Sequence, residues 1–336
     1  MSVVGDTDPT HWIRRALTAV LGVPLAAEQW QDKDAQGSLG VYFHEGKDRH
    51  GNKSTRVMAL TNKHVTSKDT TADYEYGGRP GAPPKFLAEQ LAELSADPAS
   101  DDEECTMKDK ELKVDVGILE DFLKPLDSTW SDAHQRVIGW LDWAPKIAND
   151  LENRRYTRDI GDIALEEDKF VKNFKGNFVY LVHPEEIISF FYPNAANTPS
   201  FQYPTNHLFR IRVMSTPQAW QNPTSWTSKD GQTTDLTFGR FSELEAYTCD
   251  KFDHDSWEVA VFNFNRKHGN FSNYGDSGAC IFNAEGKMVA ILHSGMPKGM
   301  SKHVTFGTPA HYVVELIRER YPQADFDRLK FAETAA

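Results

Sequence analysis

The tetrapeptide Gly-Asp-Ser-Gly at residues 275 to 278 constrains the fold more than any other stretch of the chain. Glycine adopts backbone conformations that other residues avoid, so Gly275 can turn its N–H inward beside the N–H of Ser277. Two such donors would form an oxyanion hole, which stabilises the charge on an attacked carbonyl. Gly278 would leave room for a substrate backbone. Because Gly, Asp and Ser also dominate ordinary turns, a nucleophilic Ser277 requires a general base elsewhere in the chain.

A histidine that could activate the serine ends an apolar, β-prone run at residues 57 to 65. A serine hydroxyl is a weak nucleophile, which needs a base and a carboxylate that orients the base. His64 follows the strand-like part of this run, and residues 287 to 295, after the serine, are typical of a second buried strand. The chain order His, Asp, Ser differs from the order in subtilisins and α/β-hydrolases. His64 is therefore the predicted base.

Three aspartates compete for the role of the orienting carboxylate, and the sequence leaves all three open. Asp115 begins the run Asp-Val-Gly-Ile-Leu but lies within a helical pattern. Asp162 begins Asp-Ile-Ala-Leu, although its strand would run directly into three acidic residues. Asp159 has small or apolar residues on its own side of the strand, because side chains alternate with period two. This pattern favours Asp159.

Five short segments together resemble the trypsin-like serine peptidase domains of intracellular fungal proteins. The segments are residues 60–65, 157–160, 174–177, 239–240 and 274–278. Over about residues 37 to 322, the resemblance implies an all-β core of two six-stranded antiparallel β-barrels of the chymotrypsin type. It places His64 and Asp159 in the first barrel, Ser277 in the second, and a catalytic cleft between them.

Two features depart from the pattern of that family. No activation sequence is visible that would free a new Ile or Val N-terminus. In zymogen-type members that terminal amine pairs with the aspartate before the serine, so Asp276 is expected to find another partner, either a backbone group or a basic side chain. Cys280 stands where many members have proline.

The segment after the nucleophile resembles a strand of glutamyl endopeptidases, in which a histidine before a small residue and a glycine lies in the specificity pocket. His293, Ser294 and Gly295 would take those places as substrate-binding residues, and His293 could then bind an acidic or amide P1 side chain. Phe271 stands where trypsin has its basic-selective aspartate, which disfavours Lys or Arg at P1. The alternative is that His293 is a strand-end histidine hydrogen-bonded to the backbone.

Apolar spacing predicts the rest of the organisation. Residues 9 to 30 have helical spacing, and Thr308 to Arg320 begin with a proline near the first turn, where proline is tolerated. Short strands separated by Gly-, Asn-, Asp- and Pro-rich turns predict a barrel or sandwich. The predicted regions are an N-terminal helical extension (1–36), a first barrel (37–185) with a helical insertion at about 86–134, a second barrel with a C-terminal helix (186–322), and a tail (323–336).

Composition excludes several classes of function. The 336 residues carry a net charge of −12 with no clustered basic patch, so nucleic acid is not an expected partner. No run reaches the length of a transmembrane helix and no signal-peptide pattern is present, so we expect a cytoplasmic protein with no membrane partner. Three widely spaced cysteines without a CxxC pair predict neither a disulfide framework nor a zinc site. No metal and no cofactor are expected.

These features predict a serine endopeptidase that acts on a peptide or protein substrate through an acyl-enzyme, with an acidic or amide P1 side chain as the candidate preference. The competing hypothesis is a catalytically silent trypsin-like module that binds peptides or serves in signalling. A general esterase of the α/β-hydrolase type is disfavoured, because its nucleophile would lie in Gly-x-Ser-x-Gly and residue 279 is alanine. The sequence makes no prediction of the oligomeric state.

Overall fold

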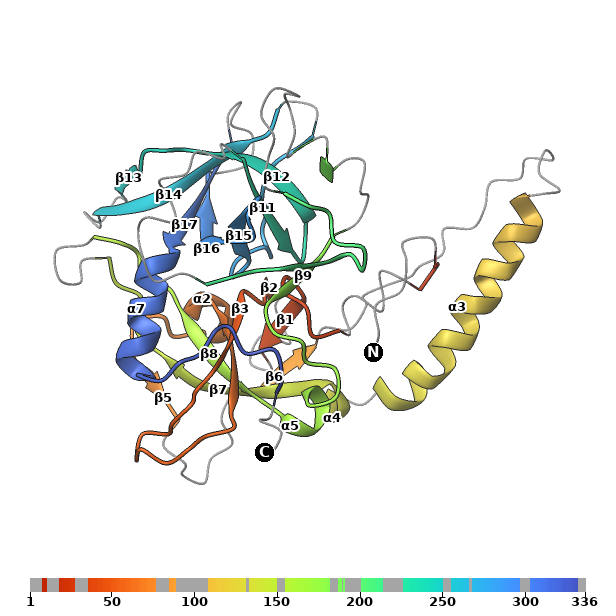
Figure 1. Ribbon diagram of the computed structural model, residues 1–336, viewed down its shortest axis with the longest axis horizontal. Coiled ribbons are helices and arrows are strands. Elements are labelled where there is room, and N and C mark those ends of the chain that lie inside the picture. Colours follow the sequence, from red (N-terminus) through yellow and green to blue (C-terminus); the bar gives the residue numbers. More distant parts are fainter. Residues whose placement is uncertain are drawn as a thin grey trace.

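Two antiparallel β-barrels lie one above the other in the computed structural model of the chain (Figure 1). The structure describes residues 8–10, 18–27, 36–76, 85–88, 108–130, 133–149, 155–181, 187–188, 190, 201–213, 226–249, 255–265, 268–296 and 303–331. This all-β, two-barrel fold of the chymotrypsin type is the one predicted from the sequence.

The first barrel is built on an antiparallel sheet of eight strands. Its strands are β1 (Pro24–Ala27), β2 (Gln36–Ser38), β3 (Val41–His44), β4 (Val57–Thr61), β5 (Tyr74–Glu75), β6 (Lys85–Ala88), β7 (Val137–Ala144) and β8 (Gly161–Leu165). They run in the order β2-β1-β6-β7-β8-β4-β3, with β5 beside β7. The end strands of this order, β2 and β3, are separated in the chain only by Leu39 and Gly40. The two ends of the sheet therefore lie close together, and the sheet curves into a barrel.

The second barrel closes by hydrogen bonding. Its strands are β11 (Trp226–Gly231), β12 (Asp235–Phe241), β13 (Ala246–Cys249), β14 (Asp255–Asn263), β15 (Cys280–Asn283), β16 (Met288–Gly295) and β17 (Val304–Pro309). The order is β12-β11-β15-β16-β17-β14-β13, and β12 also pairs with β14, which completes a ring of six strands. A separate two-stranded sheet joins β9 (Phe178–Tyr180) to β10 (Leu208–Arg210).

The helices are α2 (Lys63–Thr66), α3 (Lys108–Trp130), α4 (Ala133–Arg136), α5 (Glu167–Phe170) and α7 (Ala310–Arg320). The C-terminal helix is confirmed, although it begins two residues later than expected because Thr308 and Pro309 still pair with β16. Its residues Val313 and Ile317 are fully buried against the barrels. Within the described ranges, no helix is both long and apolar enough to cross a membrane.

Two stretches expected to be helical are strands where the structure describes them. Pro24–Ala27, within the stretch predicted as a helix from residue 9 to residue 30, form β1; residues 11–17 and 28–30 of that stretch lie outside the described residues. Lys85–Ala88, at the start of the predicted helical insertion, form β6 between β1 and β7. Pairing with distant strands satisfies the backbone of both segments, and local apolar spacing does not report such pairing.

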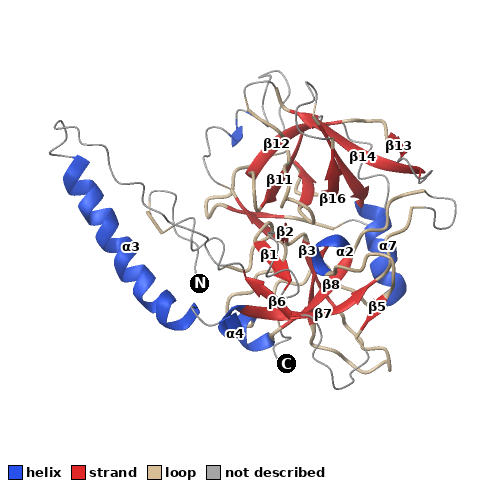
Figure 2. Cartoon of the chain, turned by 180° about the vertical axis from the view of Figure 1, so that it is seen from behind, coloured by secondary structure: helices blue, strands red, loops and turns tan. Residues whose placement is uncertain are grey.

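The remainder of the insertion is helical where described. Figure 2 shows α3 standing away from both barrels. Asp115, one of the three candidate carboxylates, lies on this helix and is exposed to solvent. The helix therefore carries Asp115 away from the body that holds His64.

Candidate active site

His64 and Asp159 lie against each other because β4 and β8 are antiparallel neighbours. Thr61, at the end of β4, pairs with Gly161, at the start of β8. The residues that follow β4 and those that precede β8 therefore meet at one edge of the sheet. There Nδ1 of His64 is 2.5 Å from Oδ2 of Asp159, and the backbone N–H of His64 donates to Oδ1 at 3.1 Å.

The environment of Asp159 favours its ionised form. Burial by itself would raise the pKa of this carboxyl, but the adjacent His64 imidazole, the hydrogen bonds from His64 and the more distant His293 lower it below its ordinary value. Nδ1–H of His64 then has an anionic acceptor, which leaves the unprotonated Nε2 as a base. About a third of the His64 side chain (35%) is exposed.

Ser277 reaches the same site from the second barrel, on the loop that leads into β15. A cavity of about 290 Å³ is lined by side chains of both barrels, with His64 from the first and Ser277 from the second. Its other lining residues are Asn270, Ser272, Asn273, Tyr274, Leu292, His293, Ser294, Gly295, Met296 and His303. The structure thus brings His64, Asp159 and Ser277 together, whereas the sequence separates them widely.

Both glycines of the serine loop are required by its geometry. Gly275 and Gly278 have φ angles of 95° and 92°, a region that residues with side chains rarely adopt. A Cβ on Gly275 would lie 2.3 Å from Oγ1 of Thr233, and a Cβ on Gly278 would lie 2.1 Å from Oγ1 of Thr61. The expectation that Gly278 leaves room for a substrate backbone is wrong. The space in which its Cβ would lie is occupied by Thr61 and Ser38 of the first barrel.

The backbone N–H groups of the serine loop divide into two that are hydrogen-bonded within the fold and two for which no carbonyl acceptor is found among the described residues. The N–H of Asp276 donates to the carbonyl of Asn273 at 3.1 Å, and the N–H of Gly278 donates to that of Leu292 at 2.8 Å. Within the part of the chain that the structure describes, no carbonyl accepts a hydrogen bond from the N–H of Gly275 or Ser277. These are the two donors that the sequence assigned to an oxyanion hole.

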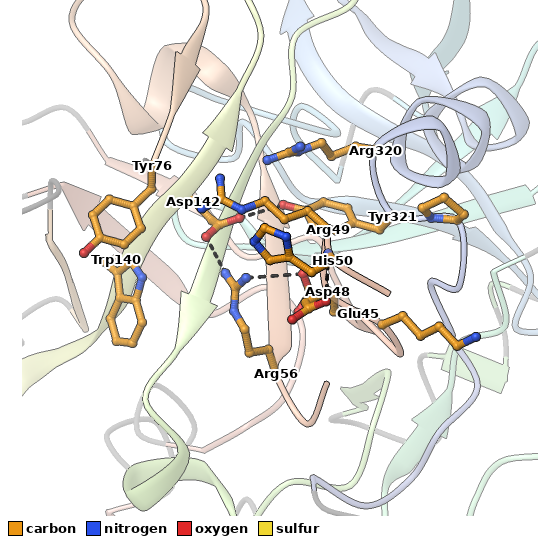
Figure 3. Close-up of a pocket in the computed structure, with 12 residues that line it drawn as sticks. Glu45, Asp48, Arg49, His50, Arg56, Tyr76, Trp140, Asp142, Arg320 and Tyr321 are labelled. Atoms are coloured by element: carbon orange, nitrogen blue, oxygen red, sulfur yellow. Dashed lines mark hydrogen bonds and ion pairs between the residues drawn. The ribbon is translucent and has the colours of Figure 1, made fainter. Parts of the chain in front are cut away.

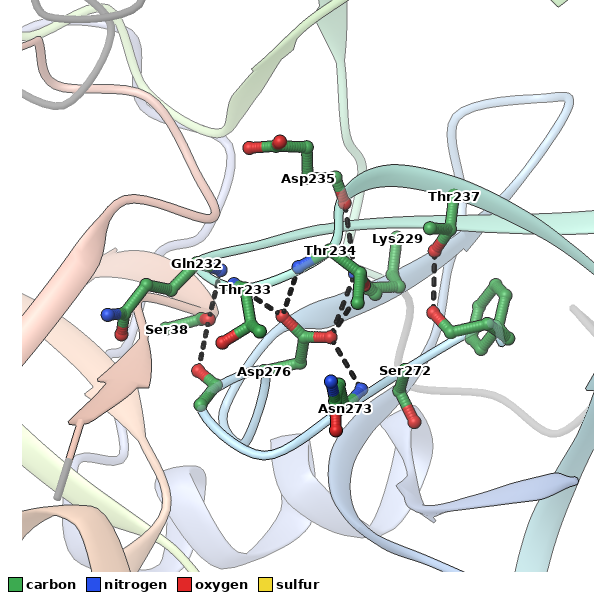
Figure 4. Close-up of polar contacts among 12 residues, drawn as sticks. Ser38, Lys229, Gln232, Thr233, Thr234, Asp235, Thr237, Ser272, Asn273 and Asp276 are labelled. Carbon is green, nitrogen blue, oxygen red and sulfur yellow. Dashed lines mark hydrogen bonds and ion pairs between the residues drawn. The ribbon is translucent and has the colours of Figure 1, made fainter. Parts of the chain in front are cut away.

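Asp276, between those two donors, is fully buried and has a basic partner. Nζ of Lys229 on β11 lies 3.2 Å from its Oδ2 (Figure 4). The sequence left this partner unspecified, as either a backbone group or a basic side chain. The sequence does not indicate Lys229, because β11 reads Trp-Thr-Ser-Lys-Asp-Gly, a polar run without the apolar alternation typical of a buried strand.

His293 lines the cavity and is backed by a buried carboxylate. Its Nε2 lies 2.9 Å from Oε2 of Glu258 on β14, and the two side chains are 8% and 1% exposed. Oε1 of Glu258 accepts a hydrogen bond from the hydroxyl of Thr157. Burial by itself would lower the pKa of His293, but the charge and hydrogen bond of Glu258, together with Asp159, raise it above the ordinary value. Glu258 therefore stabilises the imidazolium form of this side chain relative to a histidine in water.

The other specificity residues divide into those that line the cavity and one that does not. Ser294 and Gly295 line it beside His293. Phe271 does not, because its ring is 1% exposed within the apolar core of the second barrel. The substrate-binding assignment of Phe271 is therefore wrong. It was based on its position six residues before Ser277, and an apolar residue at that position packs inward.

Ser272 and His303 are among the polar residues of the cavity for which the sequence predicted no role. Nε2 of His303 lies 3.5 Å from the hydroxyl of Ser272 and 3.4 Å from that of Thr305. His303 directly precedes β17, and no local pattern in the sequence indicates that this strand end reaches the cavity.

Asp162 belongs to a different buried cluster. Its Oδ1 lies 3.2 Å from the hydroxyl of Tyr321 and accepts a hydrogen bond from the N–H of Trp143 at 3.1 Å. Burial, followed by the nearby Asp142, raises the pKa of Asp162 well above its ordinary value. A carboxyl group that favours its neutral form and bonds to Tyr321 is not placed to orient His64.

Asp142 and Tyr321 border a second cavity, of about 390 Å³, on the first barrel (Figure 3). Arg56, at its edge, is already paired with both Asp142 and Glu45. Among the described residues, no group of three or more His, Cys, Asp or Glu side chains could hold a metal ion.

No family model matches the sequence, and no curated protein sequence matches it. Solved structures resemble the fold. Thermobifida fusca protease A has a TM-score of 0.40 and 10% identity, over 89% of this chain and 96% of that one. Cellulomonas bogoriensis chymotrypsin has a TM-score of 0.40 and 10% identity, over 89% and 96%. A glutamic acid specific serine protease described as using a novel histidine triad in substrate binding has a TM-score of 0.42 and 10% identity, over 89% and 97%. At this level of similarity, an activity has to be argued from the chain's own site.

Proposed function

We propose that the chain is a serine endopeptidase with His64, Asp159 and Ser277 as its catalytic triad. One observation carries the proposal: Nδ1 of His64 is 2.5 Å from a buried Asp159 carboxylate, while the same imidazole and Ser277 line one cavity. A base oriented by a carboxylate next to a serine is the arrangement that activates a hydroxyl for attack on a carbonyl.

The mechanism follows from these groups. Oγ of Ser277 attacks the peptide carbonyl carbon while Nε2 of His64 takes the hydroxyl proton. The carbonyl electrons move to oxygen, and the N–H groups of Gly275 and Ser277 hold that oxyanion. His64 then gives its proton to the leaving amine, and the peptide bond breaks to leave an acyl-enzyme. Water, deprotonated by His64, hydrolyses the ester and restores Ser277. Asp159 fixes the imidazole tautomer and stabilises its cation throughout.

The same cavity supports a preference for an acidic P1 side chain. His293 lines the cavity with a pKa above its ordinary value, and Ser272 and Ser294 are lining residues with hydroxyl groups. A carboxylate in this cavity would gain a charge-assisted hydrogen bond. Lysine or arginine would meet the imidazolium with like charge. An amide side chain could accept the same hydrogen bond, but this bond would be weaker because the amide oxygen carries no net charge.

Cleavage of a matched set of peptides tests the proposal. The substrates would differ only at P1, as Glu, Gln, Phe or Lys, and the native chain would be compared with Ser277→Ala. We expect cleavage after Glu by the native chain, weaker cleavage after Gln, and no turnover by the variant. Turnover by Ser277→Ala would overturn the triad, whereas a native preference for Phe or Lys would overturn only the P1 assignment.

The competing function is a peptide-binding module that does not turn over. The cavity lined by Tyr274, whose side chain is 81% exposed, would serve such a module equally well. The same peptides distinguish the two functions. Saturable binding of the Glu peptide, with no cleavage by a native chain that is folded, would favour the module.

A further inference from the structure

Lys229 has no contact with solvent, and burial lowers the pKa of its ammonium group while the nearby Asp276 opposes that shift. Its side chain is 0% exposed, and its Nζ lies within hydrogen-bond distance of three oxygen atoms. These are Oδ2 of Asp276 at 3.2 Å, the carbonyl of Asp235 at 2.9 Å and Oγ1 of Thr234 at 2.5 Å. An ammonium group has three donors, so each finds an acceptor. Burial of a charge is tolerated only with such pairing.

Both carboxylate oxygens of Asp276 also accept hydrogen bonds from other groups. Its Oδ1 accepts hydrogen bonds from the N–H groups of Thr233 at 2.9 Å and Thr234 at 3.2 Å. Its Oδ2 accepts from the hydroxyl of Thr234 at 2.6 Å and the N–H of Asn273 at 2.9 Å. Figure 4 shows these bonds converging on one carboxylate. The carboxylate therefore joins the serine loop to the turn between β11 and β12.

That turn determines the direction of one oxyanion donor. The hydroxyl of Thr233 donates to the carbonyl of Tyr274 at 2.6 Å. In a trans peptide the C=O and N–H point in opposite directions, so this bond turns the N–H of Gly275 away from the turn. The next carbonyl, that of Gly275, accepts from the hydroxyl of Ser38 at 3.0 Å. Two successive peptide units of the serine loop are thus held by side chains.

We infer that Lys229 is a positioning residue, which holds the N–H of Gly275 in the orientation needed for an oxyanion hole. Its charge compensates Asp276, Asp276 holds the turn at Thr233, and Thr233 holds the peptide between Tyr274 and Gly275. Because the cation comes from a strand of the second barrel, the loop acquires this shape when the barrel folds. The inference rests on the proposed function, but its structural half can be measured without catalysis.

Lys229→Met tests the inference, because methionine fills most of the space without the charge. Loss of one oxyanion donor lowers kcat by roughly 10²- to 10³-fold, so we expect a fall of this order with KM little changed. We also expect faster amide hydrogen exchange in residues 273–278, with native exchange in the rest of the barrel. Lys124→Met is the matched control, because Lys124 is an exposed lysine of α3. It should behave as the native chain does.

A second variant keeps the test decisive if Lys229→Met folds poorly. Adding Asp276→Asn removes the carboxylate that the first change leaves unpaired, and breaking one side of a buried pair is costlier than removing both charges. The double variant should therefore regain folding and part of the exchange protection of residues 273–278. A double variant no better protected than Lys229→Met would contradict the charge-compensation step.

The outcomes separate the inference from the proposed function. If the native chain cleaves the peptides and Lys229→Met cleaves them with the same kcat, the inference is overturned and the proposed function is retained. If the native chain cleaves nothing, the proposed function fails, and hydrogen exchange decides the inference. Lost protection of residues 273–278 in Lys229→Met would then support the positioning role, and native protection would overturn it.

Discussion

His293 and Glu258 form a buried ion pair beside the serine, with Nε2 of the histidine 2.9 Å from Oε2 of the glutamate. The pair comes from two strands of the second barrel, β16 and β14, and His293 lines the cavity that His64 and Ser277 share. The proposed preference for an acidic P1 side chain rests on this pair, because Glu258 raises the pKa of His293.

Glu258→Gln should reduce that preference. Glutamine keeps the size of the side chain but removes the charge that supports the His293 cation. Charge-assisted hydrogen bonds are about twice as strong as neutral ones. A loss of about 1.4 kcal/mol in the binding of the Glu side chain corresponds to a factor of ten, so we expect the Glu-to-Gln ratio of kcat/KM to fall about tenfold. Steady-state cleavage of the two matched peptides measures it. Glu243→Gln, at an exposed glutamate between β12 and β13, is the control. A native ratio in Glu258→Gln would exclude the ion pair from specificity.

The same ratio should depend on pH. The pKa of His293 is raised above its ordinary value, so the cation is fully present below about pH 6.5 and is lost as pH rises through the raised value. The Glu-to-Gln ratio should therefore fall with increasing pH, because a pH effect that is common to both substrates cancels in the ratio. The contribution of the pair to stability should fall in the same direction. A ratio that is constant or rises between about pH 6 and about pH 9 would contradict the assignment.

Asp159→Asn and Asp162→Asn should separate the two buried aspartates. Asn at position 159 cannot hold the imidazole in the right tautomer, so kcat should fall by about 10⁴ while the fold is kept. The pKa of Asp162 in the folded protein is raised well above its ordinary value. Between the ordinary and the raised pKa, this carboxyl ionises in the unfolded chain but not in the folded one, so the free energy of unfolding falls as pH rises. Asp162→Asn should therefore retain activity and be at least as stable as the native chain at neutral pH. Kinetics and thermal unfolding of both variants would check this, and reversed effects would make Asp162 the triad acid.

A pair of glycine substitutions tests the geometry of the serine loop. Gly278→Ala would place a Cβ 2.1 Å from Oγ1 of Thr61 at a φ of 92°. Strain of this kind costs about 1–3 kcal/mol before any steric clash is added, so the variant should be destabilised and inactive. Gly117→Ala, on α3 with nothing within 4 Å of its Cβ, should leave activity native and favour the helix by about 1 kcal/mol. Equal thermal stability and activity for both variants would contradict the loop geometry.

The sequence was most informative where chemistry requires local patterns. The Gly-Asp-Ser-Gly motif depends on two positive φ angles within four residues, and Asp159 was favoured by the alternation of the residues that follow it. Such patterns are visible in one stretch of chain. His64 was found by the apolar strand before it. All three groups lie at the edges of predicted strands, and pairing of β4 with β8 brings His64 to Asp159.

The residues that the sequence missed act through long-range pairing. Lys229 and Glu258 are both buried charges in strands, and each meets its partner only when the second barrel closes. A charged residue in a strand normally predicts an exposed position, so local reasoning placed neither in a site. The same limit explains Pro24–Ala27, whose helical spacing was overridden by pairing with β2 and β6. The assignment of Phe271 to the cavity was wrong because its distance along the chain from Ser277 does not determine the direction of its side chain, which packs in the core.

Covalent labelling by a fluorophosphonate probe tests the central claim most directly, because the probe reacts with a serine only when a base and an oxyanion hole activate it. The native chain would be compared with Ser277→Ala and His64→Ala, and the modified peptide would be identified by mass spectrometry. We predict stoichiometric labelling of Ser277 in the native chain and none in either variant. A well-folded native chain that remains unlabelled at Ser277, or equal labelling in His64→Ala, would contradict the triad.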